Sequence, residues 1–100
     1  MELKGYQRSY LAKLAHDLKP VVFLGKAGAT PAVLKEIEDA LEREELIKIR
    51  FVANKEDKRY ICRKITETLG AYEVSVIGNV AILYRQASEP DNRHITIPSR

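Results

Sequence analysis

The sequence has 100 residues but only one cysteine and no tryptophan. A single thiol, Cys62, excludes an internal disulfide, so the fold depends on an apolar core, and a reducing compartment is expected. No apolar run approaches the roughly 18 residues that cross a membrane. Residues 1–4 lack the charged start and apolar stretch of a signal peptide. We therefore expect one cytoplasmic domain over residues 1–98, with no membrane partner.

Patterns that would indicate catalysis or metal binding are also scarce. Neither His16 nor His94 has a second histidine, cysteine or aspartate at metal-ligand spacing. Cys62 is expected to fill the buried side of a helix, and the carboxylates of residues 36–45 are expected to face solvent. We therefore expect a protein that is not an enzyme and that takes no cofactor, metal or small-molecule substrate. A hydrolase is a further alternative, which a screen of generic esters and phosphates would expose.

The net charge is only +3, but charge is segregated along the chain. The balance is +4 over residues 1–35, −5 over residues 36–47, +5 over residues 48–64 and −1 over residues 65–100. Basic regions attract polyanions, whereas a solvated helix face carries the same charges without any partner. Charge alone therefore leaves both interpretations open.

Apolar periodicity predicts the first elements. We expect a helix over residues 4–18, which ends at Lys19-Pro20 because the residue before a proline avoids helical angles. The continuous apolar run 21–24 predicts a strand covered on both faces. Thr30-Pro31 predicts the start of a second helix, which runs to residue 45. The buried face of the first helix is expected to hold Leu3, Gln7, Tyr10, Leu11, Leu14 and Leu18.

The remaining elements follow from alternation and turn signals. Gly70 is typical of a helix C-terminus, and Gly78-Asn79 is a hairpin signal. The expected elements are a strand at 46–52, a helix at 55–69, strands at 72–77 and 80–85, a loop at 86–93 and, where pairing allows, an edge strand at 94–98. The fold class is α/β: a single αβαβαββ domain with a mixed four-stranded sheet packed by helices, and room for that short extra C-terminal strand.

The loop Gly25-Lys26-Ala27-Gly28 is the most informative local feature. It joins a strand to a helix N-terminus, where free amides and a partial positive charge suit a phosphate. Two glycines allow unusual angles and close approach of a ligand, and Lys26 adds a cation, much as in the G-x-x-G loop of KH domains. Such a turn is also commonly structural. It lacks the length and the closing Lys-Ser/Thr of a nucleotide-binding P-loop.

Rows of basic side chains supply a second candidate feature. They include Lys4, Arg8 and Lys19 along the first helix, Lys48 and Arg50 on the second strand, and Lys55, Arg59 and Arg63 on the third helix. Rows of this kind are often simply solvated. Tyrosines are candidates for base stacking, although Tyr10 is expected in the core. The tyrosines are Tyr6, Tyr10, Tyr60, Tyr72 and Tyr84.

Several stretches, in this order, resemble the CRS1–YhbY (CRM) domain family over residues 3–98. They are Gln7-Arg8-Ser9-Tyr10-Leu11, Leu14-Ala15-His16-Asp17-Leu18-Lys19-Pro20-Val21-Val22, Gly25-Lys26-Ala27-Gly28 with Thr30, Val33-Leu34-Lys35-Glu36-Ile37 through Ala40-Leu41 to Glu45-Leu46-Ile47-Lys48-Ile49, Val76-Ile77-Gly78, Leu83-Tyr84-Arg85 and Ile95-Thr96-Ile97-Pro98. Two features depart from the family pattern: Ala29 replaces a larger apolar residue, and the segment 86–93 is longer than in the shortest members.

The resemblance implies a fold similar to the C-terminal domain of a bacterial translation initiation factor. It also implies RNA binding through the glycine loop and neighbouring basic surface. Small members resemble assembly factors that act on precursors of the large ribosomal subunit, which implies precursor ribosomal RNA and a pre-ribosomal particle as partners. Plant relatives in larger proteins promote group II intron splicing, so an intron or another structured RNA is an alternative.

The candidate RNA-binding residues combine the loop with the basic rows. They are Gly25, Lys26, Ala27, Gly28, Lys4, Arg8, Lys19, Lys48, Arg50, Arg59 and Arg63. Arg59 and Arg63 are chosen from charge alone, because the third helix matches the family least. The alternative from another class is a protein–protein adaptor that docks on the ribosome through the acidic second helix. In that case Glu38 and Glu42 would carry the contact.

Overall fold

The structure is a computed structural model that describes residues 3–99. Its order confirms the predicted αβαβαββ arrangement. The elements are α1 (Gly5–Ala15), β1 (Pro20–Leu24), α2 (Pro31–Glu44), β2 (Leu46–Phe51), a 3-10 turn (Lys55–Asp57), α3 (Lys58–Leu69), β3 (Tyr72–Ile77), β4 (Val80–Tyr84) and a second 3-10 turn (Pro90–Asn92). None of the helices within residues 3–99 is long and apolar enough to cross a membrane.

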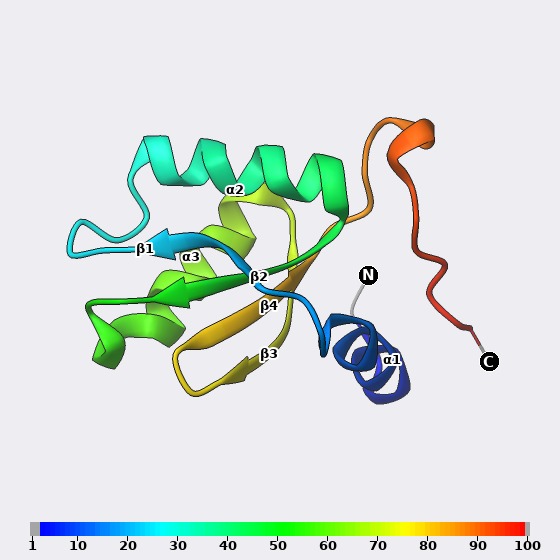
Figure 1. Ribbon diagram of the computed structural model, residues 1–100, viewed down its shortest axis with the longest axis horizontal. Helices are drawn as coiled ribbons and strands as arrows, with labels where there is room; N and C mark the ends of the chain where they lie inside the picture. Colours follow the sequence, from blue (N-terminus) through cyan, green and yellow to red (C-terminus); the bar gives the residue numbers. More distant parts are fainter. Residues whose placement is uncertain (1–2, 100) are drawn as a thin grey trace.

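The four strands form one mixed sheet in the order β1-β2-β4-β3 (Figure 1). β1 pairs with β2 in parallel through the α2 crossover, and the other two pairs are antiparallel. The mixed four-stranded sheet is therefore confirmed. The second crossover, through α3, does not produce parallel neighbours, because β4 lies between β2 and β3.

Alternation along β2 divides the core between the two faces of the sheet. Ile47, Ile49 and Phe51 are buried in a cluster with residues of α2 and α3. Leu46 belongs to a second cluster with Leu11 and other residues of α1. Successive strand residues point to opposite faces. Hence α2 and α3 pack on one face of the sheet, and α1 packs on the other.

Two expected burial patterns are wrong. In α1 the buried residues follow a strict four-residue spacing, Gln7, Leu11 and Ala15. Tyr10, Leu14 and Leu18, also expected on the buried face, are 37%, 44% and 39% exposed, and Leu18 lies beyond the end of α1. α1 packs over only one end of the sheet, so no sheet lies beneath the flank of the helix that carries Tyr10 and Leu14. Similarly, β1 is not covered on both faces, because Phe23 is 56% exposed. β1 is an edge strand, and only its α2 side is packed.

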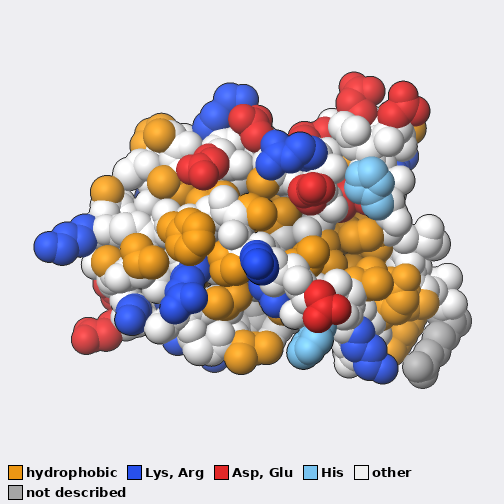
Figure 2. All heavy atoms as spheres, viewed as in Figure 1, with side chains coloured by type: hydrophobic (Ala, Val, Ile, Leu, Met, Phe, Trp, Pro, Cys, Tyr) orange, Lys and Arg blue, Asp and Glu red, His pale blue; other side chains and the backbone are white. Residues whose placement is uncertain are grey.

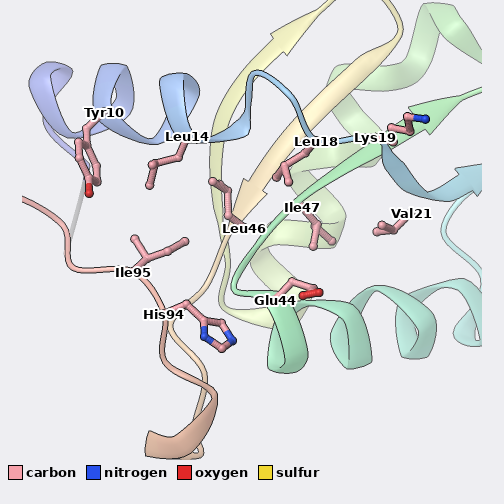
Figure 3. Close-up of a pocket in the computed structure, with 10 residues that line it drawn as sticks. All are labelled: Tyr10, Leu14, Leu18, Lys19, Val21, Glu44, Leu46, Ile47, His94 and Ile95. Atoms are coloured by element: carbon pink, nitrogen blue, oxygen red, sulfur yellow. The ribbon is translucent and has the colours of Figure 1, made fainter.

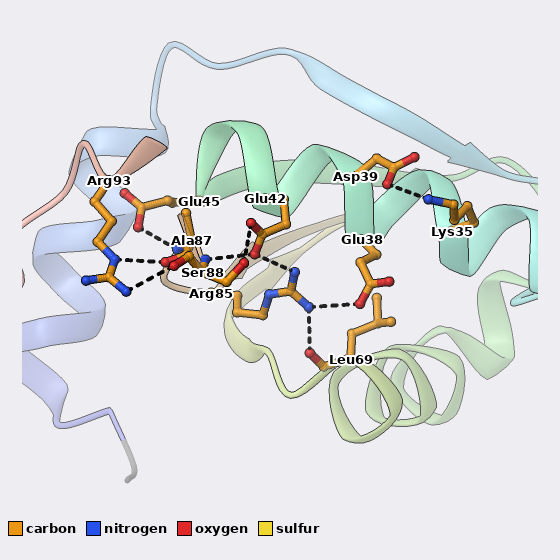
Figure 4. A network of polar contacts seen from close by, with 10 residues as sticks. All are labelled: Lys35, Glu38, Asp39, Glu42, Glu45, Leu69, Arg85, Ala87, Ser88 and Arg93. Atoms are coloured by element: carbon orange, nitrogen blue, oxygen red, sulfur yellow. Dashed lines mark hydrogen bonds and ion pairs between the residues drawn. The ribbon is translucent and has the colours of Figure 1, made fainter. Parts of the chain in front are cut away.

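Glu45 is an exception to the expected solvated carboxylates of residues 36–45. It is fully buried and has a left-handed φ of +66°, which turns the chain from α2 into β2. Its carboxylate accepts from the amides of Ala87 at 2.8 Å, His94 at 2.6 Å and Ile95 at 3.1 Å. Figure 4 shows this carboxylate beside the segment that follows β4. Because a buried carboxylate needs hydrogen-bond donors, these bonds hold the segment after β4 against the end of α2.

Two further carboxylates of α2 are bound to Arg85. Its guanidinium contacts Glu38 at 3.2 Å and Glu42 at 3.1 Å, and it donates to the Leu69 carbonyl at 2.9 Å (Figure 4). Glu42 also accepts from the amide and the hydroxyl of Ser88. Donation from Ser88, assisted by the positive charge of Arg85, lowers the pKa of Glu42. These contacts join α2, α3 and the end of β4.

The possible extra strand at residues 94–98 does not form. This segment has no strand structure, because the His94 and Ile95 amides donate to Glu45 instead of to a sheet edge. Ile95 and Ile97 pack against the α1 cluster, and the Pro98 carbonyl accepts from Gln7 Nε2 at 3.2 Å. The segment therefore covers the end of α1 without joining the sheet.

We expect Glu45→Ala to lower the free energy of unfolding by about 3 kcal/mol, because it leaves one buried and two partly buried amides without their acceptor. Alanine retains the Cβ, so the cost of the left-handed backbone is unchanged. Urea unfolding measures the loss, and Glu44→Ala, at the exposed neighbouring position, is the matched control. Equal stability of the two variants would contradict the role assigned to the buried carboxylate.

Cys62 is predicted to be chemically inert in the folded protein. Burial raises the pKa of its thiol to about 12, and the Glu73 carboxylate adds to the rise. Only the thiolate reacts, and an unfolded thiol ionises near pH ~8.5. At pH 8 a disulfide reagent should therefore react rapidly in urea and very slowly in buffer. The unfolded thiol loses its proton at a lower pH than the folded one. The free energy of unfolding should therefore fall as the pH rises above the unfolded pKa of the thiol.

Candidate functional site

The loop between β1 and α2, residues 25–28, is a tight turn with an exposed tip. The Gly28 amide donates to the Gly25 carbonyl at 3.0 Å. Gly28 has a φ of +66°, which side chains other than glycine rarely adopt, whereas Gly25 has no such angle. A Cβ added at Gly25 would meet no atom within 4 Å, so a ligand has room to approach its backbone. Only one of the two glycines is thus required by its backbone angle.

The loop leads directly into the start of α2. Thr30 Oγ1 accepts from the Val33 amide at 3.2 Å, and Pro31 begins the helix, as predicted. The amides of a helix start carry a partial positive charge, to which the exposed Lys26 adds a full one. The combination favours an anionic group held close to the backbone.

Asn54, just after β2, holds the loop in place. Its Nδ2 donates to the Lys26 carbonyl at 2.6 Å and to the Gly25 carbonyl at 3.4 Å. Asn54 adopts a left-handed φ of +52°, a conformation that asparagine tolerates. In the sequence, Asn54 lies between the predicted strand 46–52 and the predicted helix 55–69, and no local pattern indicates a partner 28 residues away. Asn54 is therefore a site residue that sequence reasoning missed.

The start of α3 flanks the loop on one side. A shallow hollow of about 350 Å³ lies between them. Tyr60 and Lys64 reach this hollow from α3, and Tyr60 is 72% exposed. Arg59 and Arg63, the candidates chosen from charge, precede these two residues and point about 100° away from them. The basic side chain that α3 places beside the loop is therefore Lys64. The hollow is lined by Ala27, Gly28, Ala29, Asn54, Asp57, Tyr60, Ile61 and Lys64.

The α1 side of the sheet brings together another part of the predicted basic surface. Arg50 is exposed on β2, and Lys19 is exposed just before β1. Lys48 is half-buried, and its Nζ donates to the His16 carbonyl at 3.1 Å, which ties β2 to the end of α1. Lys48 and Arg50 thus lie on β2, the parallel neighbour of β1, and Lys19 immediately precedes β1, which leads into the loop of residues 25–28.

The remaining candidates lie elsewhere. The Arg8 guanidinium donates to the carbonyls of Glu73 and Val74 on β3, at the opposite edge of the sheet from β1. Lys4 is exposed one turn earlier, and Arg59 and Arg63 are on α3, against the other face. The basic rows therefore do not share one face.

The tyrosines also divide into packed and open side chains. Tyr72 and Tyr84 stack on each other, with ring centroids 6.4 Å apart, and burial raises the pKa of Tyr84. Tyr10, expected in the core, instead borders an apolar groove of about 340 Å³ beside Leu14, Leu18 and Ile95 (Figure 3). Of the aromatic residues proposed for stacking, Tyr60 alone combines high exposure with a position at the loop.

No metal centre accompanies these features within residues 3–99, where no three His, Cys, Asp or Glu side chains could share an ion. His16 lies at the end of α1, whereas His94 lies against the end of α2, where its Nε2 is 3.3 Å from the Arg43 carbonyl. The site is therefore a surface of amides, cations and an aromatic ring.

Comparison with known proteins gives consistent matches. The family model of the CRS1 / YhbY (CRM) domain matches residues 3–85. An RNA-binding protein of Haemophilus influenzae is 44% identical over 87% of this chain and 89% of its own length. The "Probable RNA-binding protein YqeI" of Bacillus subtilis is 35% identical over 96% of this chain and 99% of its own.

A solved structure agrees with these sequence matches. The solution structure of a hypothetical protein from Staphylococcus aureus, described as a candidate RNA-binding protein, superposes with a TM-score of 0.81. It shares 36% identity and covers 96% of this chain and 99% of its own. Since the family model matches most of the chain and these relatives match nearly end to end, this protein belongs to the CRS1/YhbY (CRM) domain family.

Proposed function

We propose that this protein binds structured RNA without catalysis, and that the loop of residues 25–28 holds its phosphates. The observation that carries the proposal is the loop itself: an exposed turn at a helix start, with Lys26 at its tip and Asn54 fixing its backbone. A helix start with its partial positive charge and a cation on a fixed loop suit an RNA phosphate whatever the base sequence. The RNA-binding names of the relatives support the same choice.

The contact surface extends from the loop in two directions. Lys19, Lys48 and Arg50 continue it over β1 and β2, and Tyr60 and Lys64 continue it onto α3. Backbone contacts and shape dominate such recognition, since cations and amides carry no base information. Lys4, Arg8, Arg59 and Arg63 remain predictions for RNA contacts outside this surface.

We further propose that the RNA is precursor ribosomal RNA of the large subunit and that binding assists subunit assembly. Two relatives are matched over 89% and 99% of their own lengths, so the domain makes up almost all of those proteins. It is the resemblance to small members of the family that implies a role in large-subunit assembly. An intron or another structured RNA is the alternative within the same mode of binding.

A protein–protein adaptor is less well supported. The acidic residues that would carry it, Glu38 and Glu42, bind Arg85, and Glu42 also binds Ser88. Carboxylates satisfied within the chain offer little to a partner, and removing them would break contacts that join α2 to β4. Reversal of their charge therefore tests stability rather than docking.

Lys26→Glu should weaken binding to a structured RNA at least tenfold, because it replaces a phosphate contact by repulsion. Filter binding or fluorescence anisotropy over a range of salt concentrations measures the effect. The wild-type log–log slope should be about −0.7 to −0.9 per phosphate neutralised, and the variant slope should be shallower by about one phosphate.

The matched control for Lys26→Glu is Lys13→Glu, the same charge change at an exposed position on α1. It should alter affinity only slightly. Circular dichroism and thermal unfolding establish that both variants fold. A folded Lys26→Glu protein that binds like the wild type would refute the assignment of the loop.

Cross-linking in living cells, followed by sequencing of the attached RNA, tests the identity of the RNA. We expect cross-links concentrated on large-subunit precursor ribosomal RNA, because assembly factors engage that precursor. Enrichment on introns or scattered messages would refute the ribosomal role while keeping RNA binding. Absence of enrichment would refute both and favour an adaptor.

A further inference from the structure

One row of side chains crosses the whole sheet on the face that also carries α1. Phe23 on β1 pairs with Arg50 on β2, Arg50 pairs with Val80 on β4, and Val80 pairs with Ile77 on β3. Paired residues in neighbouring strands point to the same face, about 4.8 Å apart. The row therefore presents an aromatic ring, a guanidinium and two aliphatic groups in a line.

This row is open because α1 covers only one end of the face. Leu11 and Ala15 of α1 pack over Leu46 and Tyr84, at the far end of β2 and β4. At the uncovered end, Phe23 is 56% exposed and Ile77 is 67% exposed. Figure 1 shows α1 against one end of the sheet, with the strands extending beyond it. Apolar groups gathered on an open sheet face indicate a binding surface.

The charge around the row is positive. Arg50 lies within it, and Lys48 is in the next row of β2 on the same face. A hollow of about 330 Å³ beside the row is lined by both cations and by no acidic residue. In Figure 2, hydrophobic and basic side chains are intermingled over β1 and β2. Apolar and cationic side chains placed side by side suit a strand of nucleic acid, which carries both phosphates and flat apolar bases.

The row is also continuous with the phosphate-binding loop. Phe23 precedes Gly25 by two residues, about 7 Å along an extended strand. A strand of RNA held by its phosphate at Lys26 can therefore place a neighbouring base over the Phe23 ring. Bases in a duplex are already stacked on one another, so only an unpaired base can stack on a ring in a sheet.

We propose that this open half of the sheet binds an unpaired RNA segment, with one base stacked on Phe23 and the adjoining phosphates at Arg50 and Lys48. The inference rests on the proposed RNA binding and specifies which part of the RNA is bound. The loop holds the backbone of paired or unpaired RNA, and the sheet selects a single-stranded segment next to it. The preferred ligand is therefore a helix flanked by a single strand.

The test compares Phe23→Leu with Phe23→Tyr. Leucine retains an apolar side chain without a ring, whereas tyrosine retains the ring. Anisotropy is measured with a fluorescent single-stranded oligoribonucleotide of mixed sequence and with a duplex of the same sequence. Phe23→Leu should weaken binding to the single strand about tenfold, the order expected for one lost base stack, and should leave duplex binding unchanged. Phe23→Tyr should match the wild type on both probes.

Two controls separate this proposal from the function on which it rests. Tyr10→Leu alters another partly exposed aromatic residue, in the groove away from the row, and should change neither affinity. Lys26→Glu should weaken binding to both the single strand and the duplex. If Lys26→Glu weakens binding but Phe23→Leu does not, or if Phe23→Leu weakens both probes equally, stacking on Phe23 is refuted while RNA binding stands. If neither variant matters, both proposals fail.

Discussion

The reversal of the chain between α2 and β2 depends on one buried carboxylate. Glu45 makes the turn with a positive φ of +66°, and its side chain is fully buried. A buried charge is tolerable only when donors surround it, and here the donors are amides of Ala87, His94 and Ile95, far along the sequence. Satisfying that single group fixes the path of the C-terminal segment, and with it the packing of Ile95 and Ile97 against the α1 cluster.

Much of the fold could be predicted because its signals are local. Thr30-Pro31 and Gly78-Asn79 mark a helix start and a hairpin turn through angles and hydrogen bonds that involve only neighbouring residues. The burial of β1 could not be predicted, since a continuous apolar run looks the same at the edge and in the middle of a sheet. Likewise, Tyr10 and Leu14 fit a helical stripe, and only the placement of α1 at one end of the sheet decides that they are open.

The candidate site was predictable in part for the same reason. The loop of residues 25–28 is a local motif, so its exposure and its place before α2 agree with expectation. Tertiary packing, which the sequence does not show locally, decides which cations lie near the loop. α1 and α3 lie on opposite faces of the sheet, so Arg8 and Arg63 separate, whereas Lys64 and Asn54 approach the loop with no signal in the sequence.

The strand order also bears on how the chain reaches its folded state. β2 has β1 on one side from the α2 crossover, but its other edge pairs with β4, whose partner residues come 30 to 38 positions later. During synthesis from the N-terminus, β1, α2 and β2 can associate first and leave a free strand edge. That edge can be closed only once β4, which pairs with both β2 and β3, has been synthesised. Until then, the unpaired edge of β2 is open to pairing with another chain.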